Sequence, residues 1–260
     1  MKSKFSLGTL LTLLTAAMFL ACDKDGHMNP GEPGDLNEGL VVHFPFDGNS
    51  IEAISSQEYD SHGAQYVEDR FGNSNAAISL DSNYLNANVK MHDSVGTFSF
   101  WVRVENLNNI YPIFSYEGTT MGISPYRLAL DGDSIILRSD RRWGTLESNG
   151  QLEDFIIPSV IQANKWKHVV VRWSDSEELL EVFVDKKKTF SANYIDGWEL
   201  WDPEEFEAPA ASTIGGWMFE GGNHTGDRLR PFKGILDDVR TYNRKLSDHE
   251  IAMLFFSKGS

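Results

Sequence analysis

The 260-residue sequence has a single cysteine, Cys22, and few cationic side chains, with 23 Lys and Arg residues against 38 Asp and Glu residues. One cysteine cannot form a disulfide within the chain. The net charge of -15 repels phosphate backbones and anionic lipid headgroups, so we expect no nucleic acid partner. An excess of acidic residues of this size is typical of secreted domains, in which the negative charge maintains solubility.

The sequence also lacks the motifs of zinc sites and of nucleophilic enzymes. Its seven histidines are scattered, with no pair at i, i+2 or i, i+4, so ligation of the zinc type is unsupported. It contains neither a Gly-x-Ser-x-Gly motif nor a phosphate-binding loop. His168, between Lys167 and Val169, is expected to be an ordinary strand residue that faces outward.

Long hydrophobic runs are absent as well, and the one short run lies at the N-terminus. Residues 10–20 are apolar apart from two threonines and follow Lys2 and Lys4. Because this run is too short to span a bilayer comfortably, we interpret residues 1–21 as a secretory signal. Residues 22–37 contain two prolines and three glycines and are predicted to form a flexible tether.

Cys22 directly follows Phe19-Leu20-Ala21, which resembles the lipobox of bacterial lipoproteins, although that motif usually has Leu or another aliphatic residue in place of Phe19. The resemblance implies lipidation of Cys22 and anchoring to the cell envelope, at the outer membrane and facing the surface. The acidic residues Asp23 and Asp25 resemble the export tag of surface lipoproteins in Bacteroides-like bacteria. The alternative is a plain signal peptide with a chance cysteine. We expect membrane contact through the lipid anchor only.

Residues 38–260 have the length of one large β-sandwich and show no break in composition. Short runs rich in β-branched and aromatic residues alternate with turn residues, as in antiparallel sheets. These runs are residues 40–46, 97–104, 126–130, 134–138, 166–173 and 179–185. The turn Asp131-Gly132-Asp133 indicates a tight hairpin. The pattern predicts an all-β sandwich of two antiparallel sheets, a jelly roll.

The end of the chain combines a strand with a short helix. Residues 235–242 suit a half-buried strand. Ser247 precedes Glu250 by three residues, which is the spacing of a capping box that opens a helix. The apolar residues Ile251, Leu254 and Phe255 then give that helix an amphipathic pattern.

Six segments in order resemble the laminin G-like branch of the concanavalin A-like lectin/glucanase superfamily. They are residues 40–49, 69–81, 97–102, 165–171, 214–216 and the closing segment 239–251. The resemblance covers nearly the whole domain and implies a concanavalin A-like jelly roll with a short C-terminal helix. Such domains serve as sugar-binding modules, adhesive modules and catalytic domains.

Glycosidases of this superfamily place their two catalytic carboxylates on alternate residues of one strand. The closest match is Glu181 with Asp185, which are four residues apart with Phe183 between them. Because this spacing is wrong for that motif, we expect no enzymatic activity. A glycosidase whose carboxylates lie on distant loops is the open alternative.

Sugar rings present an apolar face that binding modules meet with exposed aromatic side chains. Four tryptophans lie in strand patterns where the family has core aromatics, namely Trp101, Trp166, Trp173 and Trp217. The other three lie in polar, irregular stretches. The candidate carbohydrate-binding residues are Arg141, Trp143, Trp198, Trp201 and Phe206. The alternative is that the 196–206 insertion folds back and covers a sheet face with its own aromatics.

The resemblance also implies one structural calcium ion on the convex face of the sandwich. The matching positions are Asp47, after the first strand, and Asp237, in the last strand. Calcium takes six or more oxygens, so backbone carbonyls near Gly48 and Asn73 would have to contribute. The alternative is two unrelated surface carboxylates.

These features together predict a non-catalytic carbohydrate-binding module on a lipid-anchored envelope protein, with a polysaccharide or glycan as the ligand. An adhesive or structural module that binds another envelope protein is the second hypothesis. It rests on the same fold resemblance, since laminin G-like domains often bind proteins. Neither the sugar nor the oligomeric state follows from the sequence.

Overall fold

The computed structural model describes residues 34–81, 83–87, 94–117, 126–139, 153–174, 176–193, 211–216 and 232–258. A compact unit spans Gly34–Ser260, so it begins before residue 38. Leu36, which the sequence placed in the tether, packs against a buried apolar cluster under the C-terminal helix. The expected signal segment and Cys22 lie outside the described residues.

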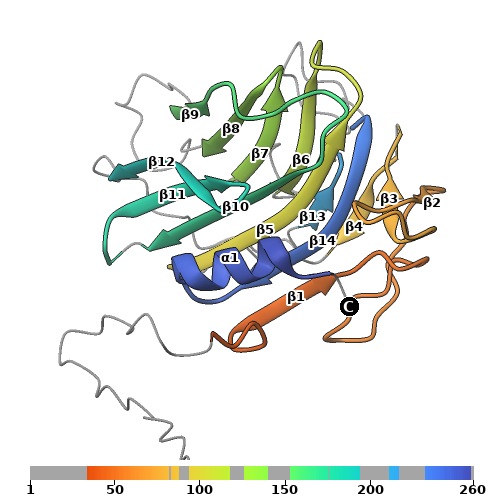
Figure 1. The fold of residues 1–260 in the computed structure, drawn as a ribbon, viewed down its shortest axis with the longest axis horizontal. Helices are drawn as coiled ribbons and strands as arrows, with labels where there is room; N and C mark the ends of the chain where they lie inside the picture. Colours follow the sequence, from red (N-terminus) through yellow and green to blue (C-terminus); the bar gives the residue numbers. More distant parts are fainter. Residues whose placement is uncertain are drawn as a thin grey trace, which may run out of the picture. The chain divides into compact units, whose positions relative to one another are not determined.

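The described part of the chain forms fourteen strands, followed by one C-terminal helix (Figure 1). They are β1 (Leu40–Phe44), β2 (Gln65–Val67), β3 (Ala77–Ser79), β4 (Leu85–Ala87), β5 (Val95–Val104), β6 (Ile110–Glu117), β7 (Tyr126–Asp131), β8 (Ser134–Ser139), β9 (Glu153–Ile157), β10 (Lys167–Ser174), β11 (Leu179–Val184), β12 (Lys187–Asn193), β13 (Ala211–Ile214), β14 (Gly234–Tyr242) and α1 (Asp248–Phe256).

These strands form two antiparallel sheets. The large sheet has eight described strands in the order β12-β11-β10-β5-β14-β3-β2, with β1 paired to β14. The small sheet has six, in the order β4-β13-β6-β7-β8-β9. This arrangement confirms the prediction of an all-β, two-sheet jelly roll.

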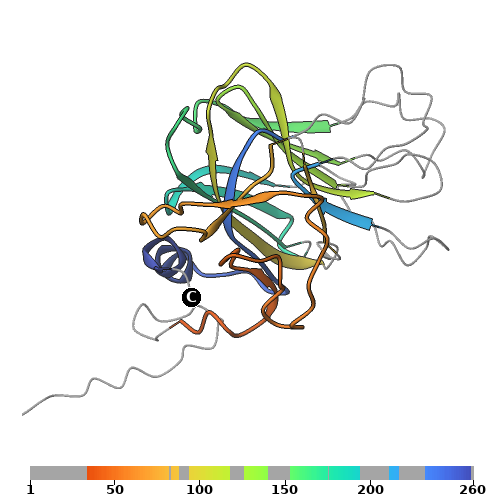
Figure 2. The same ribbon diagram turned by 90° about the vertical axis from the view of Figure 1, so that its right-hand side faces the viewer.

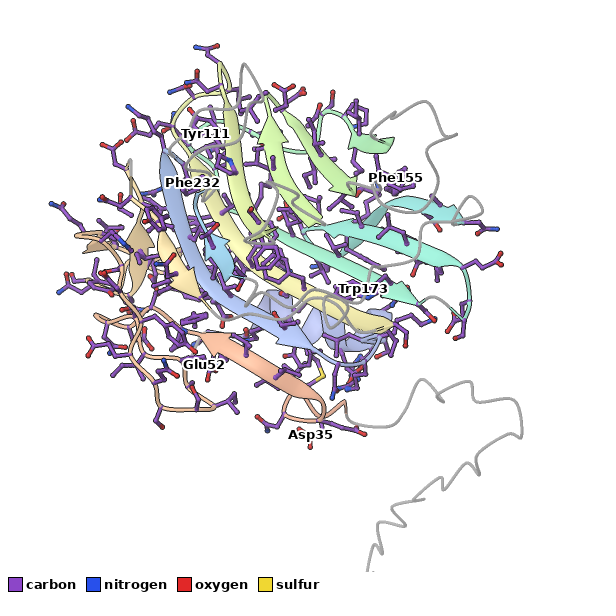
Figure 3. All side chains as sticks on the ribbon, turned by 180° about the vertical axis from the view of Figure 1, so that it is seen from behind. Asp35, Glu52, Tyr111, Phe155, Trp173 and Phe232 are labelled. Carbon is purple, nitrogen blue, oxygen red and sulfur yellow. The ribbon has the colours of Figure 1, made fainter. Side chains whose placement is uncertain are left out.

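The main core lies between the two sheets and follows from the alternation of side chains along each strand. In β5, Phe98 and Phe100 are fully buried in this core, and the Phe98 ring also contacts the Phe114 ring of the small sheet. Burial of each such ring contributes about 1.5–3 kcal/mol. Tyr111 and Phe232 meet edge to face within the same core, 6.0 Å between centroids (Figure 3).

The predicted hairpin is confirmed, and β10 and β11 form a second one. Asp131-Gly132-Asp133 turns β7 into β8, and Gly132 has a φ of 59°, a conformation that costs glycine little because it has no Cβ. β10 and β11 pair in register from Val169–Val184 to Ser174–Leu179.

The helix α1 packs on the outer face of the large sheet (Figure 1). Ser247 caps it as predicted, since the Ser247 hydroxyl accepts a hydrogen bond from the Glu250 N–H and Glu250 accepts one from the Ser247 N–H. Ile251 and Leu254 pack against Val170 and Phe183 of the sheet. Figure 2 shows α1 outside the strands. None of the described residues forms a helix long and apolar enough to cross a membrane.

Candidate functional site

A pocket of about 370 Å³ lies where the chain after β1, the loop before β3 and the strand β14 come together. Its lining includes both predicted calcium ligands, Asp47 and Asp237. The charged lining residues are Asp47, Asp69, Arg70, Asp237, Asp238 and Lys258, and the neutral polar ones include Asn73, Ser74 and Asn75. Four carboxylates therefore face two cationic side chains.

Asp47 reaches this pocket because the chain turns sharply after β1. Phe46 and Gly48 have positive φ angles of 59° and 78°, and the Gly48 N–H donates to the Phe46 carbonyl at 2.8 Å. The Phe46 ring is fully buried and stacks on Phe44, which fixes the turn. Asp47 itself is exposed at the rim of the pocket.

The loop before β3 is organised by the buried carboxylate of Asp69. One oxygen accepts hydrogen bonds from the N–H groups of Phe71 (2.7 Å) and Asn73 (2.8 Å), and the other accepts one from the Asn73 side-chain amide at 2.8 Å. An aspartate that bonds its own downstream backbone in this way fixes a tight loop. The loop directs the Arg70 side chain inward.

Arg70 joins three segments of the domain. Its Nη1 is paired with Asp237, its Nη2 lies 3.5 Å from Asp238 Oδ2, and Nη2 also donates to the Ser257 carbonyl at 3.1 Å. The side chain is 4% exposed, and its guanidinium lies 4.5 Å from the Trp101 ring centroid. Arg70 therefore ties the Asp69 loop to β14 and to the end of α1.

The strand β14 contains a bulge at this point. The register against β5 shifts between Asp237 and Arg240, and Asp238 has a φ of 51°. A non-glycine residue in this region costs about 1–3 kcal/mol and tends to occur at functional sites. The bulge buries two successive carboxylates, since Asp237 is 3% and Asp238 4% exposed.

The two buried carboxylates have opposite pKa shifts. Burial would raise the pKa of Asp238, but the hydrogen bond from His43 (2.8 Å) and the charge of Arg240 hold it well below its usual range. Burial raises the pKa of Asp237 to about 7, while Arg70 lowers it and Asp238 raises it further. The pKa of Asp237 stays raised although Arg70 and Lys258 both line the pocket. A further cation beside the Asp237 carboxylate would therefore be favourable.

The donor set of the pocket has the chemistry that calcium prefers. Among the described residues, no group of three or more His, Cys, Asp or Glu side chains is arranged to hold a metal ion. Calcium, however, accepts carbonyl and amide oxygens in addition to carboxylates. Asp47 and Asp237, with the Asn73 amide and the backbone near Gly48, line one pocket, and their oxygens are of the types that calcium accepts.

The candidate carbohydrate-binding residues, Arg141, Trp143, Trp198, Trp201 and Phe206, all lie outside the described residues, as does Trp217. Trp101 and Trp173 are buried, as predicted, at 6% and 3% exposure. Trp166 is only half-buried, and its ring lies 5.3 Å from the Arg103 guanidinium.

The strands that carry these candidate segments end together at one end of the small sheet. Tyr126 of β7 pairs with Ser139 of β8, Ser139 pairs with Glu153 of β9, and Ala211 of β13 pairs with Glu117 of β6. Segment 140–152 therefore joins two strands at this end, and segment 194–210 enters the small sheet at the same end. We call this row of strand ends the loop end of the small sheet.

An apolar pair faces outward on the small sheet. Ile136 and Ile156 are register partners, whereas their neighbours Ile135 and Ile157 are buried in the core. Ile156 is 57% exposed. Strand β9 has no recognisable strand pattern in the sequence, because Phe155, Ile156 and Ile157 form an unbroken apolar run without a period of two.

The carboxylates considered for catalysis both lie in ion pairs. Glu181 pairs with Arg172 at 2.6 Å and with Lys188. Asp185 pairs with Lys167 at 2.6 Å.

His168 differs from its expected exposed position. It faces away from the main core as predicted, but α1 covers this face, and the residue is 1% exposed. Its Nε2 lies 2.9 Å from the Ser99 hydroxyl, and its ring stacks on Trp101 at 4.9 Å. Burial lowers the pKa of His168 to about 3. A period of two identifies the face of a residue but not whether another element covers that face.

Residues 72–252 match a laminin G-like family described as the concanavalin A-like lectin/glucanases superfamily. The chain belongs to this superfamily. No curated protein sequence matches the chain. The predicted resemblance is thus confirmed, and the two sheets described above are the concanavalin A-like jelly roll.

Solved structures with this fold include several binding domains. The receptor binding domain of botulinum neurotoxin D is similar with a TM-score of 0.57 and 13% identity, over 85% of this chain and 53% of that one. The binding domain of Paraclostridial Mosquitocidal Protein 1 gives 0.55 and 20%, over 84% and 52%. The chain therefore spans about half the length of these toxin domains.

One solved structure matches over almost its whole length. Domain 4 of AbnA, an extracellular arabinanase of Geobacillus stearothermophilus solved in complex with arabinotriose, is similar with a TM-score of 0.58 and 16% identity. The match covers 83% of this chain and 98% of that domain. At this level of identity the likeness shows the fold.

Proposed function

We propose that the protein is a non-catalytic carbohydrate-binding module. The observation that carries this proposal is the match to a complete domain that was solved with a bound arabinotriose, because the match covers 98% of that domain. The toxin domains add weaker support, since they are named as binding domains and share this fold over about half of their length. The ligand is a polysaccharide or a glycan.

The loop end of the small sheet is the proposed binding region. The segments with Trp143 and with Trp198 and Trp201 join the sheet there. Indole rings stack on the apolar face of a sugar, and Arg141 would donate hydrogen bonds to its hydroxyl groups. Loops on a rigid scaffold are common sites of binding.

The ion pairs of Glu181 and Asp185 support a binding role over a catalytic one. Both carboxylates have cationic partners within the large sheet, and a general acid needs a carboxyl that stays protonated near neutral pH. Release of reducing ends from a panel of plant and host polysaccharides would instead favour a glycosidase.

We expect a glycan array with the 34–260 unit to show selective binding. Trp198→Ala and Trp201→Ala should each weaken the affinity by about 10-fold or more, because stacking on a sugar buries most of an indole face. The half-exposed Phe71 is the matched control, and Phe71→Ala should leave the affinity unchanged. A blank array, together with an envelope protein captured by pull-down, would favour the adhesive hypothesis.

For the pocket we propose one structural calcium ion held by Asp47 and Asp237. The ion would supply positive charge between the chain after β1 and the bulge of β14, where like charges otherwise repel. The support is the shared pocket and its excess of carboxylates. Asp237 would lose its raised pKa when a divalent ion is present.

We expect calcium to raise the melting temperature of the protein. A ligand that binds only the folded state at a hundredfold excess over its dissociation constant contributes about 2.7 kcal/mol, which corresponds to roughly 5–10 °C for a chain of this length. Melting curves in chelator and in millimolar calcium measure the shift. Asp47→Asn should abolish it and Asp60→Asn, a change at an exposed carboxylate, should not. Identical wild-type melting curves in chelator and in calcium would contradict the proposed calcium site.

The lipobox-like segment before Cys22 supports a location on the cell envelope. We propose that residues 1–21 are removed, that Cys22 is lipidated, and that the module is displayed on the outer membrane. Metabolic labelling with a palmitate analogue should mark the wild type and not Cys22→Ser.

A further inference from the structure

The C-terminal end of α1 carries an exposed aromatic and cationic patch. Phe256 is 67% exposed and Phe71 48%. The Lys186 ammonium lies 4.0 Å from the Phe256 ring centroid, and the Arg70 guanidinium that bonds Ser257 lies 4.6 Å from the Phe71 ring. We call Phe71, Lys186, Phe256 and Lys258 the helix-end patch.

The charge of this patch is opposite to that of the whole chain, whose net charge is -15. Lys186 and Lys258 are exposed, and within the part of the chain that the structure describes neither lies in an ion pair with a carboxylate. The neighbouring Lys188 does pair, with Glu181. Charges more than about 8–10 Å away are screened at physiological salt, so these two lysines act locally, although Lys258 also lines the pocket with the four carboxylates.

The chain enters the domain close to this patch. A Cβ on Gly34 would meet Glu250 Cγ at 2.5 Å and Met253 Sδ at 3.2 Å, so Gly34 packs against α1. Met253 is one helical turn before Phe256. Residues 22–33 extend at most about 40 Å, so an anchor at Cys22 holds this end of α1 near the membrane.

We propose that the helix-end patch docks on the anionic lipid surface to which the chain is anchored. Exposed aromatic rings beside lysines are the composition of membrane-interface contacts, and a basic side chain is attracted to an anionic leaflet. The inference rests on the proposed lipid anchor and goes beyond carbohydrate binding, and it adds a membrane contact to the expected one through the anchor alone. Because α1 covers the outer face of the large sheet, docking would leave the small sheet turned away from the bilayer.

The test uses the mature chain with Cys22→Ser and an N-terminal histidine tag held by nickel-chelating lipids, which supply the tether without lipidation. Phe256→Cys then provides the only cysteine for an environment-sensitive nitrobenzoxadiazole label. Ile156→Cys, which is similarly exposed at 57% but lies on the small sheet, is the matched control. Circular dichroism checks the fold of each variant.

We expect the label at position 256 to show increased, blue-shifted emission on vesicles that contain phosphatidylglycerol, and the label at position 156 to show none. Lys186→Glu with Lys258→Glu should lower the fraction of docked protein about tenfold or more, at roughly fivefold per basic residue. Equal emission at both positions, or no effect of charge reversal, overturns the proposal. So does an emission change caused by a soluble anionic polysaccharide or by a second copy without vesicles. Glycan binding is measured without vesicles, so the two proposals fail separately.

Discussion

Arg70→Ala is expected to destabilise the folded domain by about 3–5 kcal/mol, because it leaves the buried Asp237 carboxylate without its cationic partner. Asp238, by contrast, keeps Arg240 and His43. Arg70 is paired with Asp237 and lies 3.5 Å from Asp238. The substitution also removes the contact with Trp101 and the hydrogen bond to the Ser257 carbonyl. For a chain of this length the melting temperature should fall by roughly 6–20 °C.

An exposed ion pair on the same protein is the matched control. Lys245 pairs with Glu177, whose side chain is 52% exposed, and such pairs contribute about 0–1 kcal/mol. Lys245→Ala should therefore change the free energy of unfolding by less than about 1 kcal/mol. Equal losses in the Arg70 and Lys245 variants would contradict the importance of burial.

A double variant separates charge from packing. Arg70→Ala with Asp237→Asn replaces the unpaired carboxylate by a neutral amide, so part of the lost stability should return. If the double variant is as unstable as the sum of the single ones, lost packing rather than the orphaned charge is the cause. Denaturant titration at neutral pH, fitted with a common m-value, gives the three free energies.

The sequence predicted those parts of the fold that have local signals. Phe98 and Phe100 alternate with polar neighbours, Gly132 marks a hairpin, and Ser247 with Glu250 marks the start of the helix. Each signal depends on a few adjacent residues, so one sequence suffices. Short edge strands such as β2 and β4, with three residues each, lack such a pattern and were not predicted.

The buried polar residues between α1 and the large sheet, which include Arg70, Asp237 and His168, could not be predicted from local patterns. We call them the polar layer under α1. Arg70 lies far from Asp237 in the sequence, as His43 does from Asp238. The burial of these groups depends on the bulge in β14 and on the end of α1. The pairing of Asp47 with Asp237 in one pocket was expected only from the family resemblance. Because spacing along the chain carries no signal for such long-range contacts, the role of Arg70 emerged only from the structure.

The same layer contains the buried histidine, whose effect on stability depends on pH. Burial lowers the pKa of His168 to about 3, with Asp238 raising it and Arg70 lowering it. In the unfolded chain the pKa is about 6.5. Below pH 6.5 the unfolded state binds a proton that the native state does not bind until about pH 3, so stability falls as the pH falls across this window.

We expect His168→Gln to remove this dependence. From pH 7.5 to 4.5 the wild type should lose about 3 kcal/mol through His168, whereas glutamine cannot titrate and keeps a hydrogen-bonding group near Ser99. Asp237, whose pKa is raised to about 7, has the opposite effect over pH 7–4, because its protonated form is favoured in the native state. The quantity to compare is therefore the difference between wild type and variant at each pH.

The control for this experiment is His62→Gln, since His62 is exposed. Its difference from the wild type at each pH measures what the loss of an exposed imidazole contributes. Below about pH 4.5 the carboxylates Glu52, Glu181 and Glu250, whose pKa values are lowered, also lose stabilising charge, so the comparison ends there. If the difference for His168→Gln does not exceed that for His62→Gln over this range, the buried imidazole must take up a proton in the native state, and α1 must open to let it do so.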